Sequence, residues 1–279
     1  MEQGRGVGGT SSRAAAWLAW SLVTLSVVLL VGGIAFTQMT RSTAPQRPYY
    51  GPDDAVLLLA TVLTFSVVGA IIASRQPRNA IGWLFCGTGL MVGINGLAGG
   101  YAEYRLSGGY GPGSLAETAA WFASWSWILL VYVPTSFLLL LFPDGRLPSP
   151  RWRPVAWCAV LGLIGFLAGY TLNQGPLDDF PQITNPYGVE SPILEAVAIA
   201  GAILASASMV ASAVSLIVRM RRAGRVERQQ IKWLAYGGVL VVGAVFASGV
   251  ISIWSHNVSI AVVSVGLLGV PIFTGVAIA

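Results

Sequence analysis

Eight apolar stretches of 19 to 27 residues, separated by shorter polar gaps, make up most of this chain. The hydrocarbon core of a bilayer is about 30 Å thick, and a helix rising about 1.5 Å per residue crosses it with roughly 20 residues. Every stretch is therefore long enough to span a membrane. With 55% hydrophobic and 10% charged residues, the chain is predicted to be an all-α, polytopic membrane protein, a bundle of about eight transmembrane helices. The predicted spans are residues 14–36, 55–73, 80–101, 116–142, 155–173, 193–218, 233–254 and 258–279.

The positive charges predict how these spans are oriented. Thirteen of the sixteen Lys and Arg residues lie in the N-terminal tail or in alternate gaps, so one membrane face receives nearly all of them. By the positive-inside rule this face is cytoplasmic. Eight of the eleven carboxylates lie toward the other face, which agrees with that orientation. An even number of spans then places both termini in the cytoplasm, with residues 1–13 as a tail and 14–279 as a single transmembrane domain.

Several classes of function are excluded by what the chain carries. Nucleic-acid binding is not expected, because the basic residues are divided among short loops and form no continuous aqueous face. The only histidine, His256, has no second metal ligand near it in sequence, so we expect neither a metal nor another cofactor. No catalytic motif occurs, and we expect no enzymatic activity from this chain. A pump would need several ionisable groups at membrane depth, and the spans hold no such line of residues.

Small residues spaced three or four positions apart predict close helix packing in three spans, because they let two backbones approach. The faces are Gly89, Gly93, Gly96 and Gly100 in the third span, Gly162, Gly165 and Gly169 in the fifth, and Gly201, Ala205, Ser208 and Ser212 in the sixth. Two prolines inside spans, Pro134 and Pro271, are predicted to kink the fourth and eighth helices.

Candidate ligand residues gather toward the predicted outer face. Trp121 and Trp125 share a helical face with Glu117 and could form an aromatic wall with a carboxylate, although interfacial anchoring is the stronger interpretation. The outer gaps also hold a mixed aromatic and carboxylate set, which would suit a cationic or amphiphilic ligand if these are not simply solvated loop ends. That set comprises Glu103, Tyr104, Asp178, Asp179, Phe180 and Asn185.

Two gaps on the predicted cytoplasmic face contain sequence patterns that predict local structure. After the fourth span, the order Pro-Asp-Gly in residues 142–146, which include Asp144 and Arg146, predicts a tight turn. In the sixth gap, basic residues recur at spacings of four, three and four and would form a stripe if the helix continued beyond the membrane. Anionic lipid and a cytoplasmic signalling partner are the alternatives for what this stripe contacts. Its residues are Arg221, Arg225, Arg228 and Lys232.

Four segments carry a family resemblance. They are ASRQPRNAIGWLF (73–85), LLLLFPDGRLPSPRWRPVAW (138–157), GPLDDFPQITNPYGVES (175–191) and RVERQQIKWLAY (225–236). Together and in this order, they resemble the multi-span N-terminal membrane input regions of bacterial, notably actinobacterial, sensor histidine kinases. The resemblance implies a sensor in the bacterial plasma membrane that relays an outer-face or intramembrane stimulus to a cytoplasmic kinase domain or partner kinase. It also implies a homodimer, because such kinases work as dimers.

The resemblance leaves two points open. In such relatives the last span continues into the kinase domains, whereas this sequence ends at Ala279, so the input module is expected either to be truncated or to act on a separate partner. The competing function is a small transporter or permease subunit, in which the kinked fourth and eighth spans would line a route past Asn95. No inverted repeat divides the chain into matching halves, which counts against transport.

Overall fold

The computed structural model describes residues 7–40, 52–107, 113–225, 228–233, 235–237 and 269–277. These form six long helices and no strand, and all six are long and apolar enough to cross a membrane. The first six predicted spans are thereby confirmed as helices. Most of the seventh and eighth predicted spans, and the gap between them, lie outside the described residues. The helices are α1 (Val7–Thr40), α2 (Pro52–Arg75), α3 (Ala80–Ser107), α4 (Ser114–Leu141), α5 (Arg153–Thr171) and α6 (Pro192–Arg222).

Prolines mark several helix boundaries. α6 begins at Pro192, and α5 carries Pro154 in its first turn, where the missing N–H of proline costs no helical hydrogen bond. α4 ends before a proline, because Phe142 precedes Pro143 and adopts extended backbone. These boundaries explain why short, proline-containing segments separate long apolar helices.

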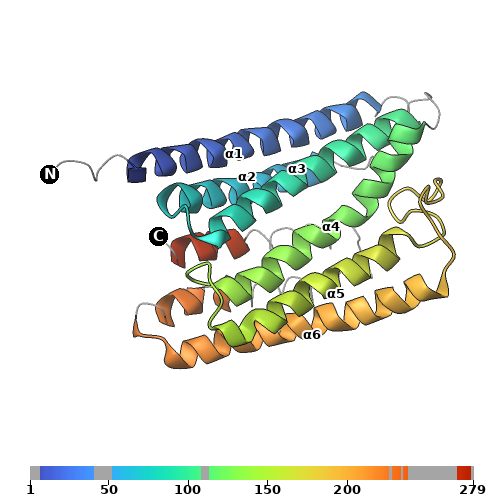
Figure 1. Cartoon of the computed structure of the whole chain (residues 1–279). Helices are drawn as coiled ribbons and strands as arrows, with labels where there is room; N and C mark the ends of the chain where they lie inside the picture. Colours follow the sequence, from blue (N-terminus) through green and yellow to red (C-terminus); the bar gives the residue numbers. More distant parts are fainter. Residues whose placement is uncertain are drawn as a thin grey trace.

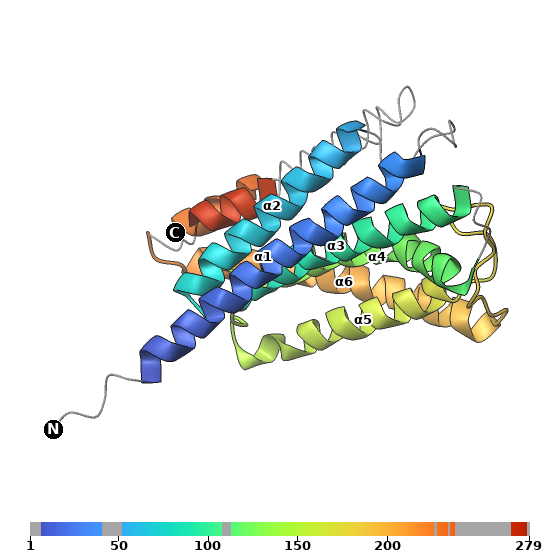
Figure 2. The same cartoon turned by 90° about the horizontal axis from the view of Figure 1, so that it is seen from above.

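The helices form two groups that α4 joins. α1, α2 and α3 pack together, α5 pairs with α6, and α4 contacts α3 as well as the α5–α6 pair. Figure 1 shows α4 crossing diagonally from the end of α3 toward α5, and Figure 2 shows the same arrangement from above. The helical residues 269–277 lie beside α2, where a Cβ on Gly275 would be 2.8 Å from the side chain of Val68.

The predicted small-residue faces are confirmed as places of close packing, and several of their glycines contact backbone directly. A Cβ on Gly93 of α3 would lie 2.5 Å from the carbonyl oxygen of Ser26 in α1. A Cβ on Gly162 of α5 would lie 2.5 Å from the backbone nitrogen of Ala205 in α6. No side chain fits in either place, so both helix groups are held by direct backbone approach.

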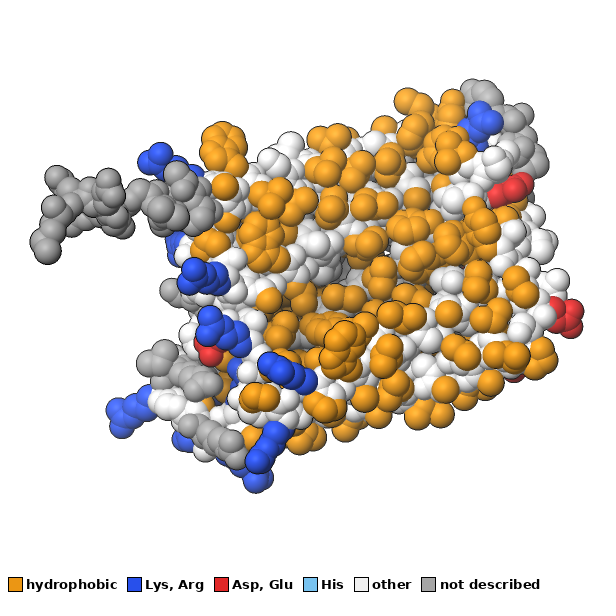
Figure 3. Space-filling view, viewed as in Figure 1, with side chains coloured by type: hydrophobic (Ala, Val, Ile, Leu, Met, Phe, Trp, Pro, Cys, Tyr) orange, Lys and Arg blue, Asp and Glu red, His pale blue; other side chains and the backbone are white. Residues whose placement is uncertain are grey.

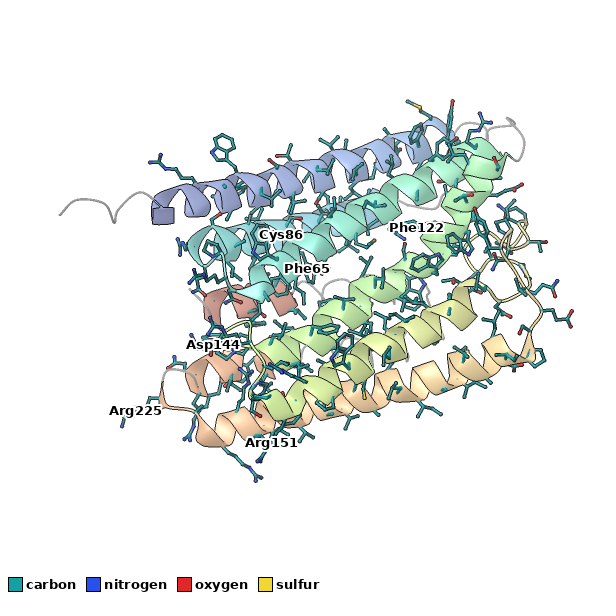
Figure 4. The ribbon with its side chains drawn as sticks, viewed as in Figure 1. Phe65, Cys86, Phe122, Asp144, Arg151 and Arg225 are labelled. Atoms are coloured by element: carbon teal, nitrogen blue, oxygen red, sulfur yellow. The ribbon has the colours of Figure 1, made fainter. Side chains whose placement is uncertain are left out.

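α4 changes direction near Phe122, which Figure 4 labels, whereas the sequence predicts a kink at Pro134. At the bend, side chains contact helix carbonyls: Asn95 Nδ2 donates to Ala123 O at 3.0 Å, and Trp127 Nε1 donates to Ser124 O at 3.0 Å. Side chains that reach into a helical hydrogen-bond ladder are a recognised cause of bending. The bend near Phe122 therefore coincides with a contact from α3.

The two ends of the bundle differ in charge (Figure 3). Lys and Arg side chains gather at the end that holds the α2–α3 and α4–α5 loops, and Asp and Glu mostly at the opposite end. We call these the basic end and the acidic end. Asp144, Arg151 and Arg225 are labelled at the basic end in Figure 4. The prediction that alternate gaps share one face is thus confirmed for the described loops, and apolar side chains cover the surface between the ends.

Candidate functional sites at the two ends of the bundle

The loop between α5 and α6, residues 172–191, is an ordered cover at the acidic end. Backbone hydrogen bonds fold it on itself, from Val189 N to Leu172 O at 2.8 Å and from Asn185 N to Gly175 O at 2.8 Å. Gly175 has a φ of +140°, which only glycine adopts readily. Leu177 and Phe180 anchor the loop, because their side chains are 6% and 4% exposed. They pack against Ala102 of α3 and Ala120 and Ala123 of α4.

Side chains of α4 also hold this loop and the end of α5. Trp121 Nε1 donates to Thr171 O at 2.7 Å, and the ring of Tyr187 packs edge-on against Trp121 with centroids 4.8 Å apart. The hydroxyls of Thr118 and Tyr187 are hydrogen-bonded at 2.8 Å. Asn185 Nδ2 donates to the same Thr171 carbonyl at 2.9 Å. The first turns of α4 are thus bonded directly to the cover.

A small pocket of about 140 Å³ lies between α4, the end of α5 and the cover. The rings of Trp121 and Trp125, with centroids 5.4 Å apart, form part of its wall together with Tyr170 and Asp178. Tyr170 OH donates to Asp178 Oδ2 at 2.5 Å. The indole nitrogen of Trp125 is buried and has no hydrogen-bond acceptor among the described residues.

A larger pocket of about 610 Å³ lies between α5 and the start of α6. It shares Tyr170, Asn173 and Gln174 with the small pocket, so the two lie on either side of these residues. Its remaining wall combines the carboxylates Glu190 and Glu195 with apolar groups. The apolar part comprises Phe166, Gly169, Val189, Pro192, Leu194, Ala198 and Ile199.

Four of the predicted ligand residues, Trp121, Trp125, Asp178 and Asn185, line the small pocket together. The other five line neither pocket. Tyr104 packs its ring against Phe36 of α1 at 5.3 Å, and Glu103 is buried in α3. Glu117 lies in the first turn of α4, Asp179 is exposed in the cover, and Phe180 belongs to the core contact described above.

Sequence reasoning misses the whole lining of the larger pocket, and with it Tyr170, Asn173 and Gln174, which line both pockets. An aromatic residue at the end of an apolar span has the pattern of an interfacial anchor. Their importance comes from the folded cover, which brings Asp178 and Asn185 back onto the end of α5. No periodicity or motif in the sequence encodes that return.

At the basic end, the predicted tight turn after α4 is confirmed and packs against the start of α3. Gly145 has a φ of +70°, and a Cβ there would lie 2.5 Å from Ala80 N. Asn79 Nδ2 donates to Pro143 O at 3.3 Å, and Asn79 Oδ1 accepts from Ile81 N at 3.0 Å. Asn79 therefore caps α3 and holds the turn at once.

Arg219 of α6 binds the same turn from the other side. It is only 9% exposed. Its guanidinium donates to Phe142 O at 2.5 Å, to Leu140 O at 3.3 Å and to Arg146 O. The planar group thus satisfies carbonyls that the end of α4 leaves without helical partners. The side chains of Asp144 and Arg146 are themselves exposed.

The predicted basic stripe is only partly correct. α6 does not continue through it, because the chain takes extended backbone at Ala223 and Gly224 follows, a common helix stop. Arg221 therefore stays on α6, apart from the later three residues. Arg225, Arg228 and Lys232 line a separate pocket of about 860 Å³. Ala223, Gln229, Trp233 and Tyr236 complete its wall.

Within the described part of the chain, no group of three or more His, Cys, Asp or Glu residues could hold a metal ion. The comparisons with known proteins found no match, whether to a protein-family model, to a curated protein or to a solved structure.

Proposed function

We propose that this chain is the membrane input module of a two-component signalling receptor, which senses a stimulus at its acidic end and relays it to a cytoplasmic kinase at its basic end. The proposal places the protein in the bacterial plasma membrane with the basic end inward, as the positive-inside rule requires. The observation that carries it is the position of α4, which is bonded to the end of α5 and to the cover at one end and to Arg219 at the other.

The contacts of α4 supply a physical route for the signal. A ligand against Trp121 and Trp125 would compete with the packing of Tyr187 and with the hydrogen bond to Thr171. Such a ligand shifts the bundle only by as much as its affinity differs between two arrangements of α4. At the far end, any displacement of Phe142 must move Arg219, because the guanidinium bonds its carbonyl. From Arg219 the chain continues to Arg225, Arg228 and Lys232, which line the pocket of about 860 Å³ at this end.

The family resemblance supports the same assignment. Two of the resembling segments, 73–85 and 138–157, are far apart in sequence, yet they meet where Asn79 donates to Pro143. Arg219, which holds the second segment, lies shortly before the fourth, 225–236. Segments that couple the sensor to the kinase are expected to contact one another at the end of the bundle that faces the kinase.

Transport is the competing proposal, and the environment of Asn95 does not favour it. Its amide donates to Ala123 O at 3.0 Å and to Ser126 Oγ at 2.8 Å, both in α4. Asn95 is 7% exposed. The side chain thus closes the seam between α3 and α4 and does not line an opening there.

The orientation can be tested with single cysteines in a variant lacking Cys86 and Cys158. A membrane-impermeant maleimide added outside intact cells should label Glu190→Cys and leave Asp144→Cys unlabelled until the cells are permeabilised. External labelling of Asp144→Cys would reverse the proposed direction of signalling.

The signalling role can be tested by joining residues 1–279 to a dimeric histidine-kinase reporter and measuring autophosphorylation in membranes. Trp121→Ala should change the kinase output, because it removes the bond between α4 and Thr171. Trp157→Ala is the matched control, since it removes an indole that is 63% exposed near the start of α5, away from the pockets and the cover. Equal output from both variants, together with solute flux in proteoliposomes, would replace this proposal with transport.

A further inference from the structure

The two pockets at the acidic end share one sign of charge. Asp178 lines the small pocket, and Glu190 and Glu195 line the larger one. Among the described residues that form these walls, there is no Lys, Arg or His. Carboxylates of one sign around a concave site produce a negative potential that concentrates cations.

The small pocket adds aromatic surfaces to this charge. Trp121, Trp125 and Tyr170 line it beside Asp178, and the faces of such rings attract an ammonium group through their quadrupoles. Tyr170 occupies one oxygen of Asp178, Oδ2, which leaves the second oxygen as an acceptor for a ligand. Rings with a carboxylate recognise a cation far better than an anion or a neutral group.

Size divides the roles of the two pockets. The small one, at about 140 Å³, lies below the range typical of sites for whole small molecules and so suits a compact headgroup only. The larger one, at about 610 Å³, falls in the range of about 300–1,000 Å³ typical of sites for whole small molecules. Its wall includes Phe166, Leu194 and Ile199. Because Tyr170, Asn173 and Gln174 line both pockets, the two pockets adjoin at these side chains.

We infer that these pockets form one binding site for an organic cation with an apolar body, whose ammonium headgroup lies between Trp121, Trp125 and Asp178. The inference rests on the proposed function and names the chemical class of the stimulus. The apolar body lies along α5 and the start of α6.

Three probes with the same six-carbon chain separate charge from hydrophobicity: hexyltrimethylammonium, hexyl sulfate and 1-hexanol. Each is titrated by calorimetry into the full chain purified in an uncharged maltoside detergent. We expect saturable binding of hexyltrimethylammonium alone. Equal binding of all three probes, or none by the cation, would overturn the inference. This comparison needs no variant, so it does not depend on whether a mutant folds.

Variants then locate the site. Asp178→Asn should weaken binding of hexyltrimethylammonium by about tenfold, as expected for loss of a charge-assisted contact. Asp144→Asn is the matched control, because it removes an exposed carboxylate at the opposite end of the bundle, and it should bind as the wild type does. Identical affinities for the two variants would show that the cation binds elsewhere.

The proposed binding site and the proposed sensing role can be refuted independently of each other. Binding of the cation without any effect on the kinase reporter leaves this site intact and removes the sensing role. A reporter that responds to Trp121→Ala, in a protein that binds none of the three probes, keeps the sensing role and removes this ligand class.

Discussion

Replacing Arg219 with methionine tests whether the basic end is held together by one buried guanidinium. The side chain donates to the carbonyls of Phe142, Leu140 and Arg146, and the bond to Leu140 is long at 3.3 Å. Hydrogen bonds to charged groups contribute about 1.5–3 kcal/mol each, so the two stronger bonds represent about 3–6 kcal/mol. Part of this free energy is recovered in the variant, because the carbonyls at the helix end become hydrated and a charge is no longer buried. We expect a net loss of about 2–4 kcal/mol in the free energy of unfolding.

The measurement is reversible unfolding in mixed micelles of maltoside and dodecyl sulfate, followed by tryptophan fluorescence. Arg221→Met is the matched control, because it removes the same charge from an exposed position on the same helix. It should change the unfolding free energy by less than about 0.5 kcal/mol, as surface substitutions usually do. Arg219→Lys should lie between the two, since a lysine keeps the charge but lacks the planar fork that reaches several carbonyls.

Hydrogen exchange gives a second readout that separates local from global effects. Arg219→Met should speed exchange in residues 142–146 before the rest of the bundle, because the guanidinium bonds the carbonyls of that turn. If Arg219→Met and Arg221→Met unfolded at the same midpoint and exchanged alike, the buried clamp would contribute nothing, and the proposed coupling through it would lose its basis.

Three further predictions use the same unfolding and exchange measurements. Gly93→Ala should destabilise the bundle by about 1–3 kcal/mol through overpacking against α1. Gly87→Ala, where a new Cβ would meet nothing within 4 Å, should be neutral or stabilising. Equal effects of the two substitutions would contradict the backbone contact at Gly93. Asn95→Leu should cost about 1 kcal/mol, the scale of interhelical hydrogen bonds in membranes, and an unchanged unfolding midpoint would show that its bonds to α4 are not stabilising. Trp121→Phe should raise exchange at the end of α5 and in residues 172–191, and Trp157→Phe, at an exposed position near the start of α5, should not; protection that stayed the same in both would mean that the Trp121 indole does not hold this region.

Sequence periodicity predicts the helices well because the membrane constrains length and polarity together. Six predicted spans correspond to described helices, although several of these helices extend beyond the apolar run, as α3 does through Ser107. A helix does not stop where apolar residues stop; it stops at a specific signal such as Pro143 or Gly224. The glycine faces are predicted equally well, because glycines at regular spacing in a membrane helix usually mark a face where another helix packs closely.

The candidate sites were less predictable because they depend on loops. Trp121 and Trp125 share a helix face, which spacing alone shows, but their contacts with Tyr187 and Thr171 depend on how residues 172–191 fold back. Likewise, Arg219 was one basic residue among several near the end of a span. Its burial against the turn after α4 follows from how α6 crosses α4, which no local pattern specifies.

The seams of the bundle differ in kind, and this difference locates where movement can occur. Within the two helix groups, backbones touch: Gly93 meets Ser26, and Gly162 meets Ala205, so sliding by even a fraction of a turn brings backbone atoms into collision. The seams that α4 makes combine apolar side-chain packing with hydrogen bonds between polar side chains. Tyr132 OH bonds Ser208 Oγ at 2.9 Å across to α6, and Asn95 bonds Ser126 across to α3. Hydroxyl and amide groups can exchange partners by rotating, whereas glycine contacts have no alternative packing. A stimulus at the acidic end should therefore move α4 relative to two rigid groups, and it should leave the α1–α3 and α5–α6 contacts intact.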